Sequence, residues 1–331
     1  MIVWRPSGPP GPCRFQSGFL KYLMSDVPEK SAVRHEIVSA DQAGQRLDNF
    51  LIGQLDGVPR SLVYRLVRTG QVRINGRRAK PMKKLKAGDE VRIPPVGTRP
   101  PRQKSIPAGL VDEIRGRIIH DDDDLLIVDK PAGLALHGGS GLSFGLVDVL
   151  AEIRQGLKPV HRLDRPTSGL VVFGCHRQAS VALQKAFSGR SVEKRYLALL
   201  CGEVAEERMQ IDEPLKKIRD ASGQHRVIVT ADGQSARSTF RLLERLNGYS
   251  YVEATIETGR THQIRAHAAH IGHPLAADDR YNSEPGPVGL KRLFLHAHYL
   301  KLPWPEEQVF NAPLPPDLGE VIDRLRGLQE N

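Results

Sequence analysis

The chain has 331 residues, of which 40% are hydrophobic and 26% charged, so it can hold two domains with substantial cores and does not have a disordered composition. No apolar run approaches the roughly 18 residues of a membrane span. The three cysteines, Cys13, Cys175 and Cys201, form no CxxC pair. The sequence therefore predicts a protein without a membrane segment, a disulfide framework or a cysteine metal site, in keeping with a reducing cytoplasm.

The first 30 residues are rich in Gly and Pro and lack apolar periodicity. We expect them to be a disordered extension. They contain no long apolar stretch before a small-residue cleavage site, which argues against a secretory signal. Met24 is an alternative start to Met1.

The net charge of +10 is concentrated in residues 45–95, which carry twelve basic and four acidic side chains, a net charge of +8. A basic run is usually a solvated face, but a compact run of one sign repels itself unless a polyanion neutralises it. This concentration favours nucleic acid as the partner.

The same segment has the pattern of a small folded domain over residues 43–95. "RLDNFLIGQL" has a helical apolar face, and a second helix begins near Pro59–Ser61 and ends at Gly70. "QVRINGRR" predicts a strand, an Asn-Gly turn and a strand, and "LKAGDEVRIP" predicts another turn and strand. This order resembles an S4-type RNA-binding domain, which implies contacts with RNA phosphates. The candidate RNA-binding residues are Arg46, Arg60, Arg65, Arg68 and Arg73.

A Pro-rich stretch over residues 96–110 predicts a linker to a second domain, residues 111–331. There, "GRIIHDDDDLLIVDKPAG" predicts two strands around an acidic turn, since consecutive Asp side chains diverge and make a poor metal site. Later alternating runs predict further antiparallel strands, and "GRTHQIRAHAAHIG" predicts the start of a helix. The fold class expected is α+β, with a mixed, mainly antiparallel sheet in the second domain.

The stretch "HRLDRPTSGL", residues 161–170, places an acid between two arginines just before a buried strand. We expect Asp164 to be held rigidly, with Thr167 and Ser168 bonding the loop backbone and Gly169 allowing a tight turn. From the residues alone, an ion pair with Arg162 or Arg165 is a more common reason for such an Asp than catalysis.

Five motifs in order resemble the large-subunit rRNA pseudouridine synthases that carry an N-terminal S4 domain, most of all their C type. They are "VDKPAGLALHGGS", "HRLDRPTSGL", "EKRYLAL", "ETGRTHQIRAHAAHIGHPLAADDRY" and "KRLFLHAHYLKLPWP". The resemblance implies isomerisation of uridine to pseudouridine in 23S rRNA or its precursor, without cofactor, metal or obligate protein partner.

The resemblance also implies a role for each matching residue. Asp164 is the catalytic carboxylate, Arg265 its partner and Tyr196 the aromatic residue that contacts the uracil. Arg162 fills the space left when the uridine is flipped out of its stack. This chain departs from the common pattern at Pro166, Ala277 and Asn282, so these loops are expected to differ in detail.

Three alternatives remain open from the sequence. His262, His267, His270 and His273 are close in sequence, but within the stretch expected to be helical only His267 and His270 have metal-ligand spacing, which makes zinc a weak hypothesis. The substrate could be tRNA or another RNA, because the motifs encode the reaction and not the target. The chain could also be a non-catalytic ribosome assembly factor, against which the complete set of Asp164, Tyr196 and Arg265 argues.

Overall fold

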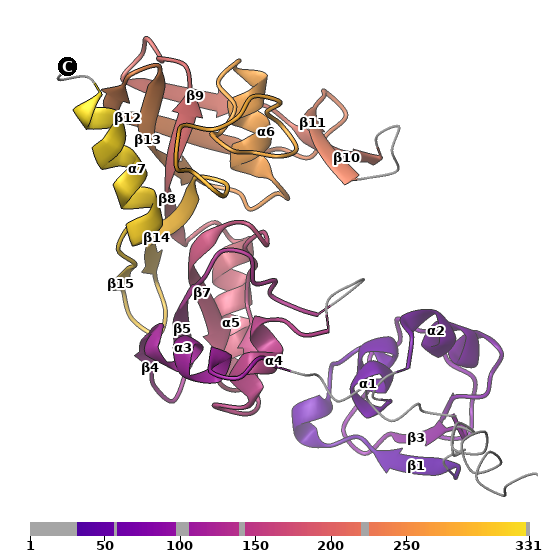
Figure 1. Ribbon diagram of the computed structural model, residues 1–331. Coiled ribbons are helices and arrows are strands. Elements are labelled where there is room, and N and C mark those ends of the chain that lie inside the picture. The colour runs from indigo at the N-terminus through magenta and orange to yellow at the C-terminus, as the bar shows by residue number, and fades with distance from the viewer. Residues whose placement is uncertain (1–31, 56–57, 97–105, 139–142, 220–224, 329–331) are drawn as a thin grey trace, which may run out of the picture. The chain divides into compact units, whose positions relative to one another are not determined.

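The structure is a computed structural model that describes residues 32–55, 58–96, 106–138, 143–219 and 225–328 (Figure 1). Two compact units form, one within residues 1–104 and the other within residues 105–331. The expected disordered extension, residues 1–30, and most of the expected linker lie outside the described residues. Within the described part of the chain, no helix has both the length and the apolar character needed to span a bilayer.

The N-terminal unit contains two helices and a three-stranded antiparallel sheet of order β1-β3-β2. Helices α1 (Leu47–Gln54) and α2 (Arg60–Arg68) agree with the predicted helices, and Gly70, with φ of +75°, follows the end of α2. The strands are β1 (Arg34–Ile37), β2 (Arg73–Ile74) and β3 (Glu90–Ile93), and a short 3-10 helix spans Ala40–Gln42.

The apolar faces of the N-terminal unit form its core. Leu47 and Leu51 of α1 and Val63 of α2 pack with Val91 and Ile93 of β3. The Asn-Gly turn after β2 is formed by two residues with positive φ, as the pair is suited to do. Strand β1 was not predicted, and its pairing with β3 carries this unit further toward the N-terminus than the expected start at residue 43.

A ten-stranded sheet is the framework of the second unit (Figure 1). Its main path has the order β4-β5-β7-β14-β8-β13-β12-β9, with β6 on β7 and β15 on β14. Only the β7–β14 pair is parallel among its pairings, which confirms the mixed, mainly antiparallel sheet. The strands are β4 (Ile118–Asp121), β5 (Leu125–Lys130), β6 (Lys158–Pro159), β7 (Ser168–Gly174), β8 (Glu193–Cys201), β9 (Arg208–Asp212), β12 (Arg237–Leu246), β13 (Tyr249–Ile256), β14 (Leu295–Leu302) and β15 (Gln308–Asn311).

Helices cover both faces of this sheet, because buried side chains alternate between the two faces of each strand. The helices are α3 (Leu110–Gly116), α4 (Leu146–Ala151), α5 (Arg177–Ser188), α6 (Gln263–His270) and α7 (Pro316–Gly327). Helices α3, α4 and α6 contribute to the core that contains Ala198 and Leu200 of β8, whereas α7 packs with Leu199. Helix α5 packs with Leu170 and other residues of the opposite face of β7.

Strands β10 (Leu215–Arg219) and β11 (His225–Val229) form a separate antiparallel hairpin (Figure 1). Leu215 and Val227 of the hairpin pack with Ala266 of α6 and with Tyr281. The hairpin therefore rests against the helix that carries Arg265.

The acidic run after β4 is a turn between two strands, as expected. The carboxylate of Asp122 accepts hydrogen bonds from the backbone N–H groups of Asp124 and Leu125, each 2.8 Å. Asp121 pairs with Arg154, and Asp124 with His176 at 2.7 Å. The side chains diverge to separate partners, which explains why the run does not form a cluster.

Candidate active site

Asp164 lies on the loop between β6 and β7, where the chain enters the centre of the sheet. A turn follows it immediately, closed by the Thr167 N–H, which donates to the Asp164 carbonyl at 3.1 Å. Pro166 is inside this turn, so it replaces a residue whose own N–H is not needed to close it. The departure at Pro166 is therefore compatible with a fixed Asp164.

A second segment, after β5, fastens the same loop. The Gly133 N–H donates to the Arg165 carbonyl at 2.8 Å, and the Arg165 Nε donates to the Gly133 carbonyl at 2.9 Å. Lys130, which is completely buried, donates through Nζ to the carbonyls of Pro131 and Leu134, each at 2.9 Å, and lies 3.4 Å from that of Arg165. Burial lowers the pKa of Lys130 to about 7, although the nearby Asp164 opposes this shift.

The expected roles of Ser168 and Gly169 were wrong in detail. Ser168 does not bond the loop backbone; its hydroxyl is bonded to His296 of β14 at 3.0 Å and accepts from Arg292 at 3.2 Å. Gly169 is inside β7, where a Cβ would lie 2.3 Å from the Ala297 carbonyl oxygen. Glycine is needed there because β14 approaches closely in the parallel pair.

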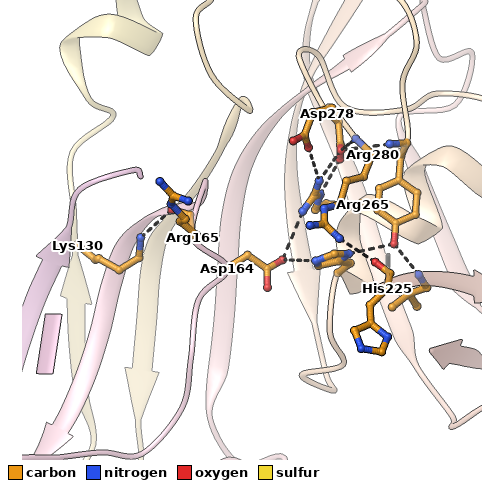
Figure 2. A network of polar contacts seen from close by, with 11 residues as sticks. Lys130, Asp164, Arg165, His225, Arg265, Asp278 and Arg280 are labelled. Atoms are coloured by element: carbon orange, nitrogen blue, oxygen red, sulfur yellow. Dashed lines mark hydrogen bonds and ion pairs between the residues drawn. The ribbon is translucent and has the colours of Figure 1, made fainter. Parts of the chain in front are cut away.

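The Asp164 carboxylate faces residues far away in sequence and not its two neighbouring arginines. Oδ2 lies 3.7 Å from His262 Nε2 and 3.8 Å from Arg265 Nη1. Figure 2 shows Asp164 between Lys130 and Arg165 on one side and Arg265 on the other. The Arg165 side chain is hydrogen-bonded to the Gly133 carbonyl, and Arg162 is exposed. An ion pair between Asp164 and a neighbouring arginine therefore does not explain this loop.

Arg265 is a buried cation on α6, with 2% of its side chain exposed. It forms a two-point pair with the fully buried Asp278, with Nε to Oδ2 2.7 Å and Nη2 to Oδ1 2.5 Å, and it contacts Asp279 at 3.2 Å. Burial alone would lower the pKa of Arg265, but the hydrogen bonds and charge of Asp278, with the charge of Asp164, raise it. The guanidinium is therefore permanently charged and held in one orientation beside Asp164. Sequence reasoning missed Asp278.

His262 precedes α6 in a left-handed conformation, with φ of +51°. Its Nδ1 is hydrogen-bonded to the Tyr281 hydroxyl at 3.1 Å, and that hydroxyl accepts from Val227 N–H of the β10–β11 hairpin at 3.0 Å. Burial lowers the pKa of His262, while Asp164 opposes the shift. The sequence placed His262 only in a histidine cluster and not beside the carboxylate. A non-glycine residue with positive φ at a polar pocket is typical of a functional site.

A small pocket opens in front of the carboxylate, and Asp164, Tyr196 and Arg265 all line it. Tyr196 is on β8, is 8% exposed and contributes both to the core and to the pocket wall. Burial and the Asp164 charge raise the pKa of Tyr196, so its hydroxyl stays neutral. Arg162 also lines the pocket and is exposed, free to contact a ligand at its mouth.

The clustered histidines have other partners. His267 is bonded to the Ser238 hydroxyl and to the Glu213 carbonyl, each at 2.9 Å, and His273 to the Cys201 carbonyl at 2.9 Å. His270 is exposed. Among the described residues, no group of three or more His, Cys, Asp or Glu side chains is placed to hold a metal ion.

The five arginines predicted to contact RNA in the N-terminal unit differ in their surroundings. Arg60, Arg65 and Arg68 are exposed on α2, and Arg73 is exposed on β2 while donating to the Gly76 carbonyl at 3.2 Å. Arg46 is instead bound at two points to the buried Asp48, at 3.0 and 2.5 Å, and is 39% exposed. Arg46 thus stabilises the start of α1 as well as offering part of its surface.

Comparisons with known proteins agree with both units. The S4 domain family model matches residues 45–91, and the RNA pseudouridylate synthase family model matches residues 124–270. Ribosomal large subunit pseudouridine synthase C of Pasteurella multocida (strain Pm70) is 40% identical over 89% of this chain and 94% of that protein. The protein of the same name from Escherichia coli (strain K12) is 41% identical over 90% of this chain and 98% of that protein.

Solved structures also match this chain over about two thirds of its length. Human RNA Pseudouridylate Synthase Domain Containing 4 matches with a TM-score of 0.56 and 26% identity, over 66% of this chain and 95% of that chain. Human RNA Pseudouridylate Synthase Domain Containing 1 matches with a TM-score of 0.55 and 25% identity, over 67% of this chain and 98% of that chain.

Proposed function

Because this chain is a pseudouridine synthase that belongs to the S4-domain ribosomal large-subunit family, we propose that it converts specific uridines of 23S rRNA, or of its precursor, to pseudouridine. The observation that carries the proposal is the pocket in which Asp164 faces Arg265 beside Tyr196. The rRNA substrate follows the names of the relatives, and with this substrate we propose a cytoplasmic location.

The reaction rearranges atoms without adding or removing any. The bond between uracil N1 and ribose C1′ breaks, the uracil turns in the pocket, C5 forms a bond to C1′, and the proton lost from C5 is balanced by one gained at N1. We propose Asp164 as the catalytic carboxylate, acting either as a nucleophile at C1′ or as a base toward the sugar. Arg265 holds a positive charge beside the carboxylate and orients it, since the guanidinium is itself fixed by Asp278. The residues supply this chemistry without a cofactor or a metal in our proposal.

The other two proposed substrate contacts follow from position. Tyr196 presents a ring and a neutral hydroxyl to the pocket, which suits stacking on the uracil. Arg162, exposed at the pocket mouth, takes the place of the uridine that leaves its stack. Phosphates of the surrounding RNA are contacted by the exposed arginines of the N-terminal unit, Arg60, Arg65, Arg68 and Arg73. Arg46 contributes less, because it is paired with Asp48.

Asp164→Asn is the direct test of this function. The change keeps the size of the side chain and removes its charge, so pseudouridine formation should fall by at least about a thousandfold while RNA affinity stays within about twofold. The readout is tritium release or sequencing-based detection of pseudouridine in 23S rRNA, with Asp123→Asn, an exposed residue of the acidic turn, as the control. Substantial turnover by purified Asp164→Asn would remove the carboxylate from the mechanism.

The substrate is tested separately by mapping pseudouridines across rRNA and tRNA in cells that lack the protein. Loss confined to 23S rRNA, restored by wild type and not by Asp164→Asn, is the expected result. Loss of pseudouridine from tRNA alone would show that the enzyme carries out the same reaction on tRNA and not on rRNA.

A further inference from the structure

A second groove adjoins the pocket and shares with it Arg162, Tyr196 and Arg260. We call it the Lys194 groove; it is also lined by Phe187 and Arg190, at the end of α5, and by Lys194 of β8. Four of its side chains are cationic: Arg162, Arg190, Lys194 and Arg260. Its one acidic residue, Glu257, is paired with Arg237 at 3.4 Å. The groove is therefore suited to an anion.

Lys194 is the residue that distinguishes this groove from an ordinary basic surface. It is 6% exposed, yet no hydrogen bond or ion pair of its ammonium is found within the described part of the chain. The contact that its Nζ makes is with the ring of Phe187, 5.8 Å from the centroid. Burial lowers the pKa of Lys194. A lysine whose side chain is almost wholly buried, but whose ammonium group opens onto a groove without a protein anion beside it, is placed to bind an anion supplied from outside.

The position of Lys194 on β8 relates it to the uracil site. Lys194 and Tyr196 are two residues apart on one strand, so their side chains are on the same face, about 6.6 Å apart along it. The distance from the proposed uracil contact to the groove is therefore about the spacing between neighbouring nucleotides. Arg190 and Arg260 flank it and leave a path for a chain that runs on from the pocket.

We propose that Lys194 binds a backbone phosphate of the RNA next to the target uridine. The inference rests on the proposed function, because it assumes that the flipped nucleotide occupies the pocket beside Tyr196. Lys194 provides substrate binding and takes no part in bond breaking. Its ammonium, at the tip of an otherwise buried side chain, opens onto the groove and makes a charge-assisted hydrogen bond once the phosphate enters, and Arg190 and Arg260 add attraction from the groove walls.

The test combines Lys194→Met with RNA fragments in which one phosphate at a time, near the target uridine, is replaced by an uncharged methylphosphonate. For the wild-type protein, neutralising one particular linkage should raise KM about tenfold and leave kcat within about twofold of its value on unmodified RNA. Lys194→Met should raise KM by the same factor on unmodified RNA and be insensitive to that linkage. Its slope of log affinity against log salt should be shallower by about 0.7, the value for one contact with a single strand.

Stability separates this role from a structural one. Methionine has a similar length without the buried charge, so Lys194→Met should melt at the same temperature as wild type or higher. Lys185→Met, an exposed change on α5 outside the groove, is the matched control and should leave KM and linkage sensitivity unchanged. Lys194→Arg should restore part of the affinity.

The inference is overturned if the sensitive linkage remains equally sensitive in Lys194→Met, or if that variant has wild-type KM. A destabilised Lys194→Met with unaltered RNA binding would show a packing role instead. The proposed function fails in a different way, namely if wild type forms no pseudouridine in any of these RNAs.

Discussion

At the scale of single residues, the decisive feature is a cation that the fold buries completely. Arg265 is held at two points by Asp278, and another carboxylate, that of Asp164, lies 3.8 Å away on the pocket side. A buried pair of this kind seldom adds stability compared with apolar side chains, but breaking it leaves an uncompensated charge. Its value here is orientation: the guanidinium cannot turn away from Asp164, the carboxylate proposed to be catalytic.

Asp278→Asn tests this positioning role. We expect a loss of about 3 kcal/mol in the free energy of unfolding, because Arg265 loses its principal partner in the interior. Turnover should fall more than tenfold at temperatures where the variant is folded, and kcat should fall more than KM rises, since the change acts on the orientation of Asp164 and not on RNA binding. Chemical denaturation and steady-state kinetics provide the two readouts.

Ala277→Gly is the matched control from the same loop. Ala277 has φ of +55°, a left-handed conformation that glycine adopts more readily. The variant should keep full turnover and unfold at the same denaturant concentration or a higher one. If Asp278→Asn behaved like Ala277→Gly, the Arg265–Asp278 pair would have no part in catalysis.

Candidate site residues with their own motif could be proposed from the sequence, and residues defined by contacts between segments could not. Asp164, Tyr196 and Arg265 lie in separate motifs, and the structure brings all three to one pocket. Nothing in the sequence near Asp278 distinguishes it from Asp279, but one is fully buried and the other 83% exposed. Lys194 presents the same problem. Its burial, and the lack of an ion-pair partner among the described residues, are visible only in the structure.

At the scale of elements, β7 and β14 carry the site. Their two-residue parallel register, His296 with Ser168 and Ala297 with Gly169, fixes the strand that follows the Asp164 loop. Apolar runs and alternation predicted six strands of the second unit, β4, β5, β7, β8, β12 and β13, but not β6, β9, β10, β11, β14 or β15. They also did not predict which strands would be neighbours, since pairing between distant segments has no local signal. Strand β1 was also missed, because its mostly exposed residues show little hydrophobic alternation.

Gly169→Ala tests this close approach. The added methyl would lie 2.3 Å from the Ala297 carbonyl, at φ of +114°, so β14 must shift or β7 must change conformation. We expect destabilisation of about 3 kcal/mol and loss of most turnover through displacement of the Asp164 loop. Calorimetric melting with parallel activity measurements is sufficient to check both.

Gly319→Ala is the control for Gly169→Ala. Gly319 is inside α7, and a Cβ there would meet nothing within 4 Å. Alanine should therefore stabilise the protein by up to about 1 kcal/mol through higher helix propensity. Equal effects of the two substitutions would show that β14 does not require a glycine at residue 169.

At the scale of the whole molecule, charge and chemistry are divided between two units. The N-terminal unit holds the exposed arginines of α2, and the second unit holds the pocket with its own compact core. Because each unit has a separate hydrophobic core, a chain that begins at residue 105 should fold without the first unit. This fragment should still isomerise uridine at high RNA concentration.

The fragment should bind structured rRNA more weakly and with less dependence on salt. For every phosphate that the fragment no longer binds, the slope of log affinity against log salt should become shallower by about 0.7 to 0.9, because fewer counterions are released on binding. Choice among rRNA uridines should also loosen, since phosphate contacts set the register in which the target reaches the pocket. Arg65→Gln with Arg68→Gln in the full-length chain should reproduce part of the slope change without altering either core, as both side chains are exposed. Equal slopes and equal site choice for the full chain, the double variant and the fragment would mean that the basic N-terminal surface is solvated and does not hold the RNA.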